Sequence, residues 1–333
     1  MLTIPEVPKQ KKRRSLAVLT SGGDAPGMNA AIRSVVRFGL SHGCRMHGIS
    51  KGYSGLLEGN ITPLESTSVA NIIQRGGTIL KTDRCEAFFQ RATRREAANI
   101  LIRNGIDGLV VIGGDGSFTG AHLLENETGF PTIGIPGTID NDIAGTDDTI
   151  GFDTAVNTAL AAIDRIRDTA SSHDRIFLIE VMGRSSGFIG LSVGIGGGAE
   201  TMILPESQET VANICKTIER GSRRGKTSSI IVVAEGKKPG LSARLARDLW
   251  KKGYTARVCI LGHTQRGGSP SAHDRLLASV LGASAVAYLL AGKSNAMVGV
   301  REDSVVLCPF RKVVGFKKSV DSQMLHLAKA LSL

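Results

Sequence analysis

The sequence predicts an α/β protein with mainly parallel sheets. Short apolar runs alternate with longer helical patterns between residues 15 and 290, as in chains built from βαβ units. Many of the 41 glycines directly follow an apolar run, where a strand would pass through a loop into a helix. The length of 333 residues is enough for two such domains, each with its own core.

The first half begins with a basic tail at residues 1–14. Apolar runs without helical periodicity then indicate strands, and patterns with one apolar face indicate helices. Ser68 could cap a short helix that Gly76 and Gly77 would end. Strands are expected at residues 15–20, 46–50, 78–80, 108–112 and 132–135, and helices at 28–41, 68–74, 91–103 and from about 117.

The second half continues the same alternation after a long helix at residues 153–171. Loops carrying carboxylates end near Ile150 and loops carrying cations begin, so we expect a change of domain there. Strands are expected at residues 175–181, 201–204, 229–234 and 256–261, with an edge strand at 305–309, and helices after 187 and at 208–220, 242–252 and 272–290.

The chain carries a formal charge of +11, part of it in a run near the N-terminus. A nucleic-acid or targeting patch is one interpretation of this run, but no aromatic residues interleave it, which favours a solvated tail. The remaining positive charge fits anionic substrates. The run consists of Lys9, Lys11, Lys12, Arg13 and Arg14.

Five cysteines lie far apart in the sequence and show no metal-ligand spacing. Their odd number favours reduced thiols, as in cytoplasmic proteins. No apolar run reaches the roughly 18–20 residues of a membrane span, and the N-terminus lacks the apolar core of a signal peptide. A cytoplasmic enzyme is therefore expected.

Two loops near the middle of the chain carry the chemistry. Residues 113–117, Gly-Gly-Asp-Gly-Ser, follow one strand, and the glycines allow a ligand to approach the Asp115 carboxylate, which suits Mg²⁺. Residues 136–142 follow the next strand and present Asp140 and Asp142 on either side of Asn141. One loop can cradle a phosphate and the other can supply a base, which together suggest phosphoryl transfer to a hydroxyl.

A third glycine-rich loop, residues 21–27, lies between the first strand and its helix. Backbone N–H groups and the helix dipole favour an anion there, although a tight turn without a ligand remains an equal alternative. On the following helix, Arg33 and Arg37 share one face. Paired cations of this kind either face solvent or bind an anion.

Five sequence blocks, in this order, resemble ATP-dependent 6-phosphofructokinases of the bacterial type. The resemblance implies two Rossmann-like three-layer domains, a glycolytic, allosteric homotetramer, and transfer of the ATP γ-phosphoryl group to the 1-hydroxyl of fructose 6-phosphate. It implies an ATP- and Mg²⁺-binding domain at residues 15–150 and about 264–315, and a sugar phosphate domain at 151–263 and about 316–333. The blocks are LTSGGDAPGMN at 19–29, VIGGDGS at 111–117, PGTIDNDIAGTDDTIG at 136–151, EVMGRSSG at 180–187 and LGHTQRGGSP at 261–270.

The resemblance also implies roles for single residues. Asp140 would be the general base, Thr138 and Asp142 would orient the reacting groups, and Arg184 would offset phosphoryl charge. The nucleotide would lie at Gly23, Arg84, Cys85, Gly114, Asp115, Gly116 and Ser117, with Mg²⁺ on Asp115. Fructose 6-phosphate would contact Thr138, Asp140, Arg175, Met182, Gly183, Arg184, Glu235, Arg257, His263 and Arg266, with Arg175 and Arg257 supplied by a neighbouring subunit.

Two glycines bear on the phosphoryl donor. Pyrophosphate-dependent relatives typically carry Asp at the position of Gly116 and Lys at that of Gly137, so the glycines here favour ATP. The effector site is less complete, because Ser66 and Thr227 stand where cations are common and weaken the case for control by ADP or phosphoenolpyruvate. Its remaining positions are Arg33, Arg37, Arg167, Glu200, Arg224 and Lys226.

Other functions remain open at this point. A pyrophosphate-dependent or mixed-donor enzyme would use the same acceptor and base. A kinase for another acceptor, such as NAD, could share the glycine-rich loop, although His263 and Arg266 argue against it. A non-catalytic phosphosugar sensor would not need Asp115, Asp140 and Arg184 together, and a nucleic-acid-binding protein lacks a recognisable module.

Overall fold

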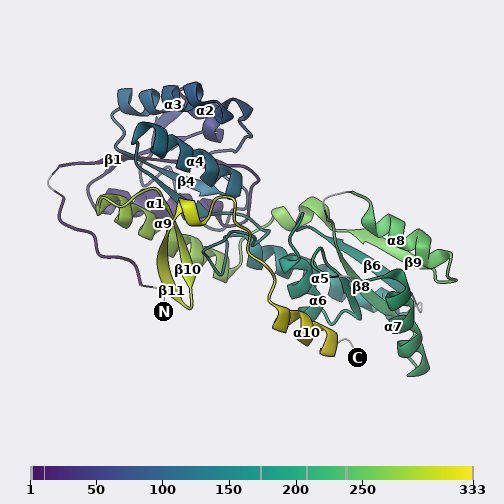
Figure 1. Ribbon diagram of the computed structural model, residues 1–333. Coiled ribbons are helices and arrows are strands. Elements are labelled where there is room, and N and C mark those ends of the chain that lie inside the picture. The colour runs from purple at the N-terminus through teal and green to yellow at the C-terminus, as the bar shows by residue number, and fades with distance from the viewer. Residues whose placement is uncertain (1–2, 11, 173–174, 208, 237–238, 332–333) are drawn as a thin grey trace. The chain divides into compact units, whose positions relative to one another are not determined.

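The computed structural model describes the chain except residues 1–2, 11, 173–174, 208, 237–238 and 332–333, so Lys11 of the basic run and Gln208 of a predicted helix lie outside the described residues (Figure 1). The chain forms two compact units. The first comprises Met1–Thr138, Ile143–Asp153 and Arg266–Lys318. The second comprises Ile139–Asp142, Thr154–Gln265 and Ser319–Leu333.

The first unit contains a seven-stranded sheet in the order β11-β10-β5-β4-β1-β2-β3. Its central strands are parallel, whereas β3 and β11 at the two edges run antiparallel to their neighbours. The strands are β1 (Ser15–Ser21), β2 (Arg45–Ile49), β3 (Ile61–Pro63), β4 (Gly108–Gly113), β5 (Thr132–Pro136), β10 (Ala296–Arg301) and β11 (Ser304–Pro309).

Helices cover both faces of this sheet, with α2, α3 and α4 on one side and α1 and α9 on the other (Figure 1). The α4 side is filled by large apolar side chains, such as Phe118 and Phe310, whose ring centroids lie 5.6 Å apart. The elements are α1 (Met28–Ser41), α2 (Gly52–Leu57), α3 (Arg91–Arg103), α4 (Asp115–Thr128), α9 (Ala272–Leu290) and the 3₁₀ turns Glu86–Phe89 and Phe310–Lys312.

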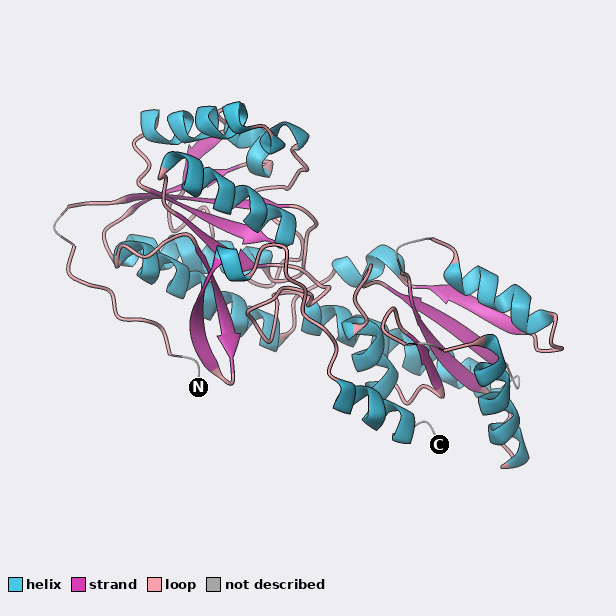
Figure 2. Cartoon of the chain, viewed as in Figure 1, coloured by secondary structure: helices cyan, strands magenta, loops and turns pink. Residues whose placement is uncertain are grey.

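The second unit contains a four-stranded, fully parallel sheet in the order β7-β8-β6-β9 (Figure 2). Alternate residues of β6 and β8 face α7 and α8 on one side and α6 on the other, which gives three layers. The elements are α5 (Phe152–Ser172), β6 (Ile176–Val181), α6 (Phe188–Gly196), β7 (Thr201–Ile203), α7 (Val211–Arg223), β8 (Ser229–Ala234), α8 (Leu241–Trp250), β9 (Ala256–Ile260), the 3₁₀ turn Gly262–Arg266 and α10 (Ser322–Leu331).

The predicted α/β class and most predicted elements are confirmed, including the helices at residues 28–41, 91–103 and 272–290 and the edge strand near 305–309. The predicted helix at 68–74 and strand at 78–80 are wrong, since these residues form turns. The side chain of Asn29 forms hydrogen bonds with the backbone of the residues that follow the predicted helix. It donates to the carbonyls of Arg75 and Gly76 and accepts from the Ile79 N–H.

Four helices and strands in the described chain were not expected: the short helix α2, strands β3 and β10, and the C-terminal helix α10. None of the helices in the described part of the chain is both long enough and apolar enough to cross a membrane.

Candidate active site

Three adjacent strands of the first unit, β1, β4 and β5, have their carboxyl ends side by side. Ser21 of β1 is paired with Gly113 of β4, and Gly113 is paired with Pro136 of β5. The loops that follow these strands are the three glycine-rich loops of the sequence. Because they leave the carboxyl ends of neighbouring parallel strands, they meet where open α/β sheets bind ligands.

Ser117 joins two of these loops. Its hydroxyl donates to the carbonyl oxygen of Ser21 over 3.0 Å, and its own carbonyl accepts from the buried hydroxyl of Tyr53 over 2.7 Å. A Cβ at Gly113 would lie 2.5 Å from both the Ser117 Oγ and the Ser21 oxygen, so only glycine fits there. Burial raises the pKa of Tyr53, which keeps its hydroxyl protonated as the donor.

Helix α4 begins at Asp115 without a side-chain cap. Its first amide groups are therefore available to an anion, and the exposed Asp115 carboxylate stands beside them. Among the described residues, no cluster of three or more His, Cys, Asp or Glu side chains could hold a metal by itself. A single carboxylate fits Mg²⁺, which keeps several waters and takes its other ligands from substrate phosphates.

The other predicted nucleotide residues lie around the loop after β1. The hydroxyl of Thr82 donates to the Gly22 carbonyl over 2.7 Å, which holds the chain leading to Arg84 beside this loop. Arg84 is exposed, and Cys85 is half-buried against the core of the unit. Arg266 also lies here, because its Nη1 donates to the Asp24 carbonyl over 3.0 Å.

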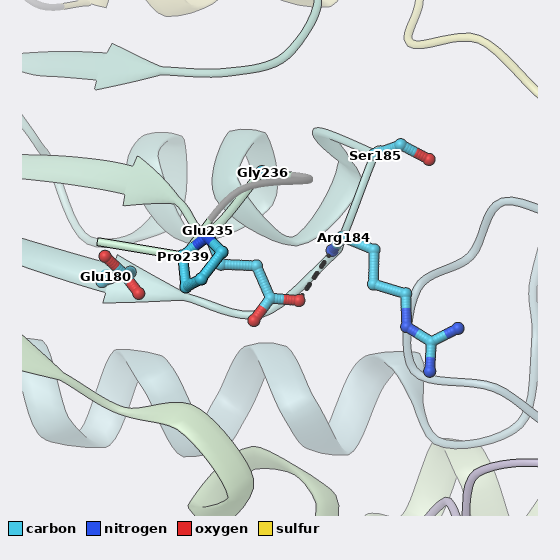
Figure 3. A pocket seen from close by; sticks show the side chains of 6 residues that line it. All are labelled: Glu180, Arg184, Ser185, Glu235, Gly236 and Pro239. Carbon is cyan, nitrogen blue, oxygen red and sulfur yellow. Dashed lines mark hydrogen bonds between the residues drawn. The ribbon is translucent and has the colours of Figure 1, made fainter. Parts of the chain in front are cut away.

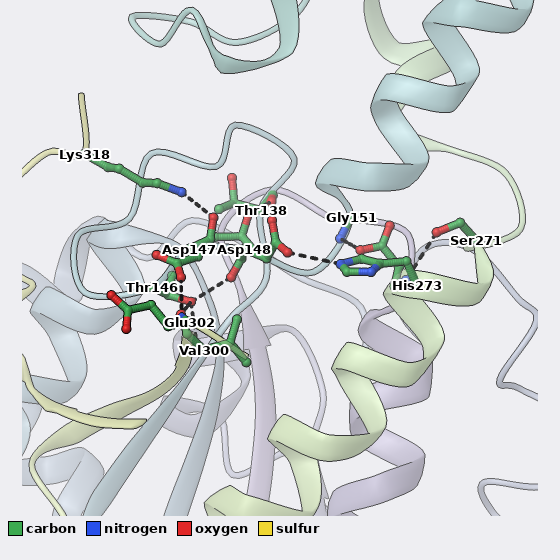
Figure 4. Close-up of polar contacts among 12 residues, drawn as sticks. Thr138, Thr146, Asp147, Asp148, Gly151, Ser271, His273, Val300, Glu302 and Lys318 are labelled. Atoms are coloured by element: carbon green, nitrogen blue, oxygen red, sulfur yellow. Dashed lines mark hydrogen bonds and ion pairs between the residues drawn. The ribbon is translucent and has the colours of Figure 1, made fainter. Parts of the chain in front are cut away.

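The loop after β5 is held at both ends within the first unit. The Gly137 N–H donates to the Gly113 carbonyl over 3.0 Å, and the buried Thr149 hydroxyl donates to the Thr138 carbonyl over 2.6 Å. Figure 4 shows the stretch that follows, where Gly151 donates to Asp274 over 2.8 Å and His273 pairs with Asp148. These contacts fix the position of Thr138.

Asp140 belongs to the second unit and is 5% exposed. Its backbone carbonyl accepts a hydrogen bond from the Ser186 hydroxyl over 2.9 Å. Asn141 takes the left-handed conformation, with φ of 50°, which Asn tolerates better than most residues. Asp142 follows and is half-buried. The two predicted carboxylates therefore lie on a turn that is tied to the loop after β6.

That loop forms part of a pocket of about 510 Å³ within the second unit (Figure 3). Arg184 has a φ of 51°, and its backbone N–H donates to Glu235 Oε1 over 2.9 Å. Gly183 has a φ of 140°, and a Cβ there would lie 2.5 Å from the Ser186 carbonyl. The pocket is lined by Glu180, Arg184, Ser185, Glu235, Gly236 and Pro239.

Of the residues expected to contact a sugar phosphate, Arg184 and Glu235 line this pocket. Met182 is buried beside it, and its N–H donates to Gln265 Oε1 over 2.8 Å. Glu180, which stands two residues before Met182 in the same motif, was not predicted to line the site. A buried carboxylate at the carboxyl end of a strand was the signal that could have found it.

The remaining predicted sugar residues are more widely placed. His263 is exposed in the 3₁₀ turn after β9, so it is not a core histidine. Arg257 is exposed on β9, at the edge of the four-stranded sheet, and Arg175 is half-buried just before β6.

The predicted effector residues divide into two groups. In the second unit, Glu200 forms an ion pair with Lys226, and Arg167 Nη1 lies 4.0 Å from Glu200 Oε1. Arg224 is exposed at the end of α7. Arg33 and Arg37 belong to α1 in the first unit.

Comparison with known proteins finds similar sequences and structures over nearly the whole chain. The phosphofructokinase family profile matches residues 15–289. The ATP-dependent 6-phosphofructokinase of Clostridium novyi is 54% identical over 319 residues, covering 96% of this chain and 99% of that protein. The ATP-dependent 6-phosphofructokinase 1 of Thermus thermophilus is 54% identical over 321 residues, covering 96% and 100%. The solved phosphofructokinase of Saccharomyces cerevisiae superposes with a TM-score of 0.84 at 35% identity, covering 96% of this chain and 46% of that chain.

Proposed function

The chain belongs to the phosphofructokinase family, and we propose that it transfers the γ-phosphoryl group of ATP to the 1-hydroxyl of fructose 6-phosphate. The products are fructose 1,6-bisphosphate and ADP, and the reaction belongs to glycolysis.

The observation that carries this proposal is the hydrogen bond from Ser186 to the Asp140 carbonyl, which joins a buried carboxylate to the loop of a polar pocket. Asp140 is also two residues from Thr138 of the first unit, so covalent geometry keeps their Cα atoms within about 7 Å. A base is thus linked both to an acceptor pocket and to the loops at the sheet edge.

In the proposed reaction, Asp140 accepts the proton of the 1-hydroxyl as this oxygen attacks the γ-phosphorus. Thr138 and Asp142 orient the nucleophile and the transferring group. Arg184 offers its guanidinium to the phosphoryl oxygens, where charge gathers in the transition state.

On the nucleotide side, the amides at the start of α4 and the loop at Gly23 would receive the phosphates. Asp115 would hold Mg²⁺, which when bound would supply positive charge to offset that of the ATP phosphates. Arg84, Cys85, Gly114, Gly116 and Ser117 would complete this side of the site.

On the acceptor side, Met182, Gly183 and Glu235 would contact the sugar, and His263 and Arg266 would bind its 6-phosphate. Arg175 and Arg257 would come from a neighbouring subunit of a homotetramer. Arginine suits this role because its guanidinium binds two phosphate oxygens at once.

The presence of glycine at positions 116 and 137 supports ATP as the donor. A Cβ at Gly116 would meet nothing within 4 Å, so the space beside Asp115 stays open. At Gly137, a Cβ would lie 3.0 Å from Ile112 Cγ2 and 3.1 Å from Met28 Cε, so a lysine there would strain the core.

Regulation and location complete the proposal. An anionic effector would bind at Arg33, Arg37, Arg167, Glu200, Arg224 and Lys226.

The enzyme would act in the cytoplasm, because all five cysteines lie in the described residues and none forms a disulfide.

The test is the formation of fructose 1,6-bisphosphate from fructose 6-phosphate with Mg²⁺, comparing ATP with pyrophosphate. Turnover with ATP alone is the expected result. Turnover with pyrophosphate would keep the acceptor but overturn the donor. No turnover with either donor would contradict the proposed reaction.

A further inference from the structure

We infer that Glu180 is a positioning residue for fructose 6-phosphate, an inference that rests on the proposed function. Glu180 stands near the carboxyl end of β6, is 7% exposed and lines the pocket with Arg184 and Glu235 (Figure 3). Its side chain and its backbone hold two other segments of the pocket region.

The side chain holds the first turn of α8. Glu180 Oε2 accepts a hydrogen bond from the Ser242 hydroxyl and another from the Ser242 N–H over 3.3 Å. Ser242 is fully buried, and the residue before the helix, Gly240, provides no side-chain cap. Glu180 therefore caps the N-terminus of α8 from a distant position in the sequence. Its negative charge lies at the positive end of the helix dipole.

The backbone holds the segment after β9. The Leu261 N–H donates to the Glu180 carbonyl over 3.0 Å, two residues before His263. Glu180 thus contacts two segments. One is the start of α8, which follows the pocket residues Glu235, Gly236 and Pro239, and the other is the end of β9, which leads to His263. These segments, together with the loop that begins at Met182, carry the proposed sugar contacts.

A charged side chain in this place requires a reason beyond packing. Burying a carboxylate is costly, and a second negative charge near Glu235 is unfavourable in a site for a phosphorylated substrate. A neutral residue could fill the same volume. The buried carboxylate is explained if the hydrogen bonds that it accepts from Ser242 are needed to hold the pocket wall where the sugar binds.

The experiment measures kcat and the KM values for fructose 6-phosphate and ATP in Ser242→Ala, Glu180→Gln and the double variant. We expect the KM for fructose 6-phosphate to rise by about three- to tenfold in Ser242→Ala, because a buried hydrogen bond to a charged group is lost. Glu180→Gln retains an acceptor oxygen and should show a smaller rise. The double variant should show less than the product of the two effects, since both changes remove one interaction.

Thr210→Ala is the matched control, because the Thr210 side chain caps α7 of the same unit, accepting from the Asn213 N–H over 3.2 Å, and does not line the pocket. It should lower the unfolding temperature without changing either KM. The inference is overturned if wild-type protein is active and Ser242→Ala leaves the KM for fructose 6-phosphate unchanged. It is also overturned if both KM values change together, as in general misfolding. Inactive wild-type protein would instead contradict the proposed function itself, and the inference with it.

Discussion

Ser186 donates a hydrogen bond from its hydroxyl to the backbone carbonyl of Asp140, with an Oγ–O distance of 2.9 Å. Both residues are 5% exposed. Asp140 is adjacent in sequence to the loops of the first unit, yet this bond ties its backbone to the pocket loop of the second. The backbone of the proposed base is therefore held by the pocket loop of the second unit.

The first prediction concerns Asp140→Asn. The amide cannot accept the hydroxyl proton, so we expect kcat to fall by about 10²–10⁴. The KM for ATP should change little, because no proposed nucleotide contact is removed. Steady-state assays of fructose 1,6-bisphosphate formation measure both values. A variant with a kcat within threefold of wild type would rule out Asp140 as the base.

The second prediction tests the backbone contact through Ser186→Ala. The change leaves the Asp140 carboxylate in place but removes the bond that fixes its turn, at a cost of about 1 kcal/mol. We expect kcat to fall by roughly three- to tenfold, far less than in Asp140→Asn. An equal loss in the two variants would show that Ser186 takes part in the chemistry or that the fold is lost, and circular dichroism separates these cases.

The third prediction concerns the donor, through Gly116→Asp and its uncharged control Gly116→Asn. Both side chains would enter open space, so the unfolding temperature should stay within about 2 °C of wild type for either, consistent with a surface change. The Asp variant should raise the KM for ATP by about tenfold or more, because its carboxylate repels the phosphates. Similar KM values for the two variants would show that charge at this position does not select the donor.

Much of the fold could be predicted because strands, glycine loops and helices follow one another regularly. Helices α1, α3 and α9 were predicted to the residue, since α1 and α3 each have one apolar face and α9 is a long, mostly apolar run that ends before Gly292. The segment at residues 68–80 could not be predicted, because its backbone partners include the side chain of Asn29, about 50 positions away in the sequence. Local propensity carries no information about such a contact.

The arrangement of the candidate site could be predicted only in part. Arg184 and Glu235 were expected at one sugar site, and they line one pocket, although their roles there remain predictions. The inferred positioning role of Glu180 could not be predicted, because it depends on a contact with Ser242, 62 positions later in the chain. The position of Arg266 beside Asp24 also depends on the folded loops, because the two residues are 242 positions apart.

The fourth prediction concerns pH and the ion pair between the buried Arg94 and the half-buried Glu127. Two hydrogen bonds from the Arg94 guanidinium hold the pKa of the Glu127 carboxyl below its ordinary value of about 4.3. Because this pKa is lowered on folding, the ion pair stabilises the fold at pH values above the ordinary pKa of the carboxyl. This stabilisation is lost as the pH falls through the pKa of Glu127 in the folded protein.

Glu127→Gln should therefore lower the unfolding temperature at pH 7 by roughly 3–6 °C, with a difference that shrinks below about pH 4. Thermal unfolding at several pH values measures this. The control is Glu96→Gln, because Glu96 pairs with Arg103 at the surface and both side chains are more than half exposed, so it should have little effect. A difference for Glu127→Gln that grows on acidification would contradict the assigned direction.

The fifth prediction concerns the proposed effector site, where Lys226 forms an ion pair with Glu200. Ser66 and Thr227 are uncharged and stand where two further cations are common, so the positive electrostatic potential that would attract an anionic effector is weak. We expect phosphoenolpyruvate or ADP to change the half-saturating concentration of fructose 6-phosphate by less than about twofold in the wild-type protein. Adding cations through the double variant Ser66→Arg and Thr227→Lys should enlarge this response several-fold, because both positions are exposed and can hold long side chains. A double variant of Ser66→Gln and Thr227→Gln separates charge from size. A strong effector response in the wild-type protein, or an equal gain in the glutamine control, would show that the missing cations do not limit control at this site.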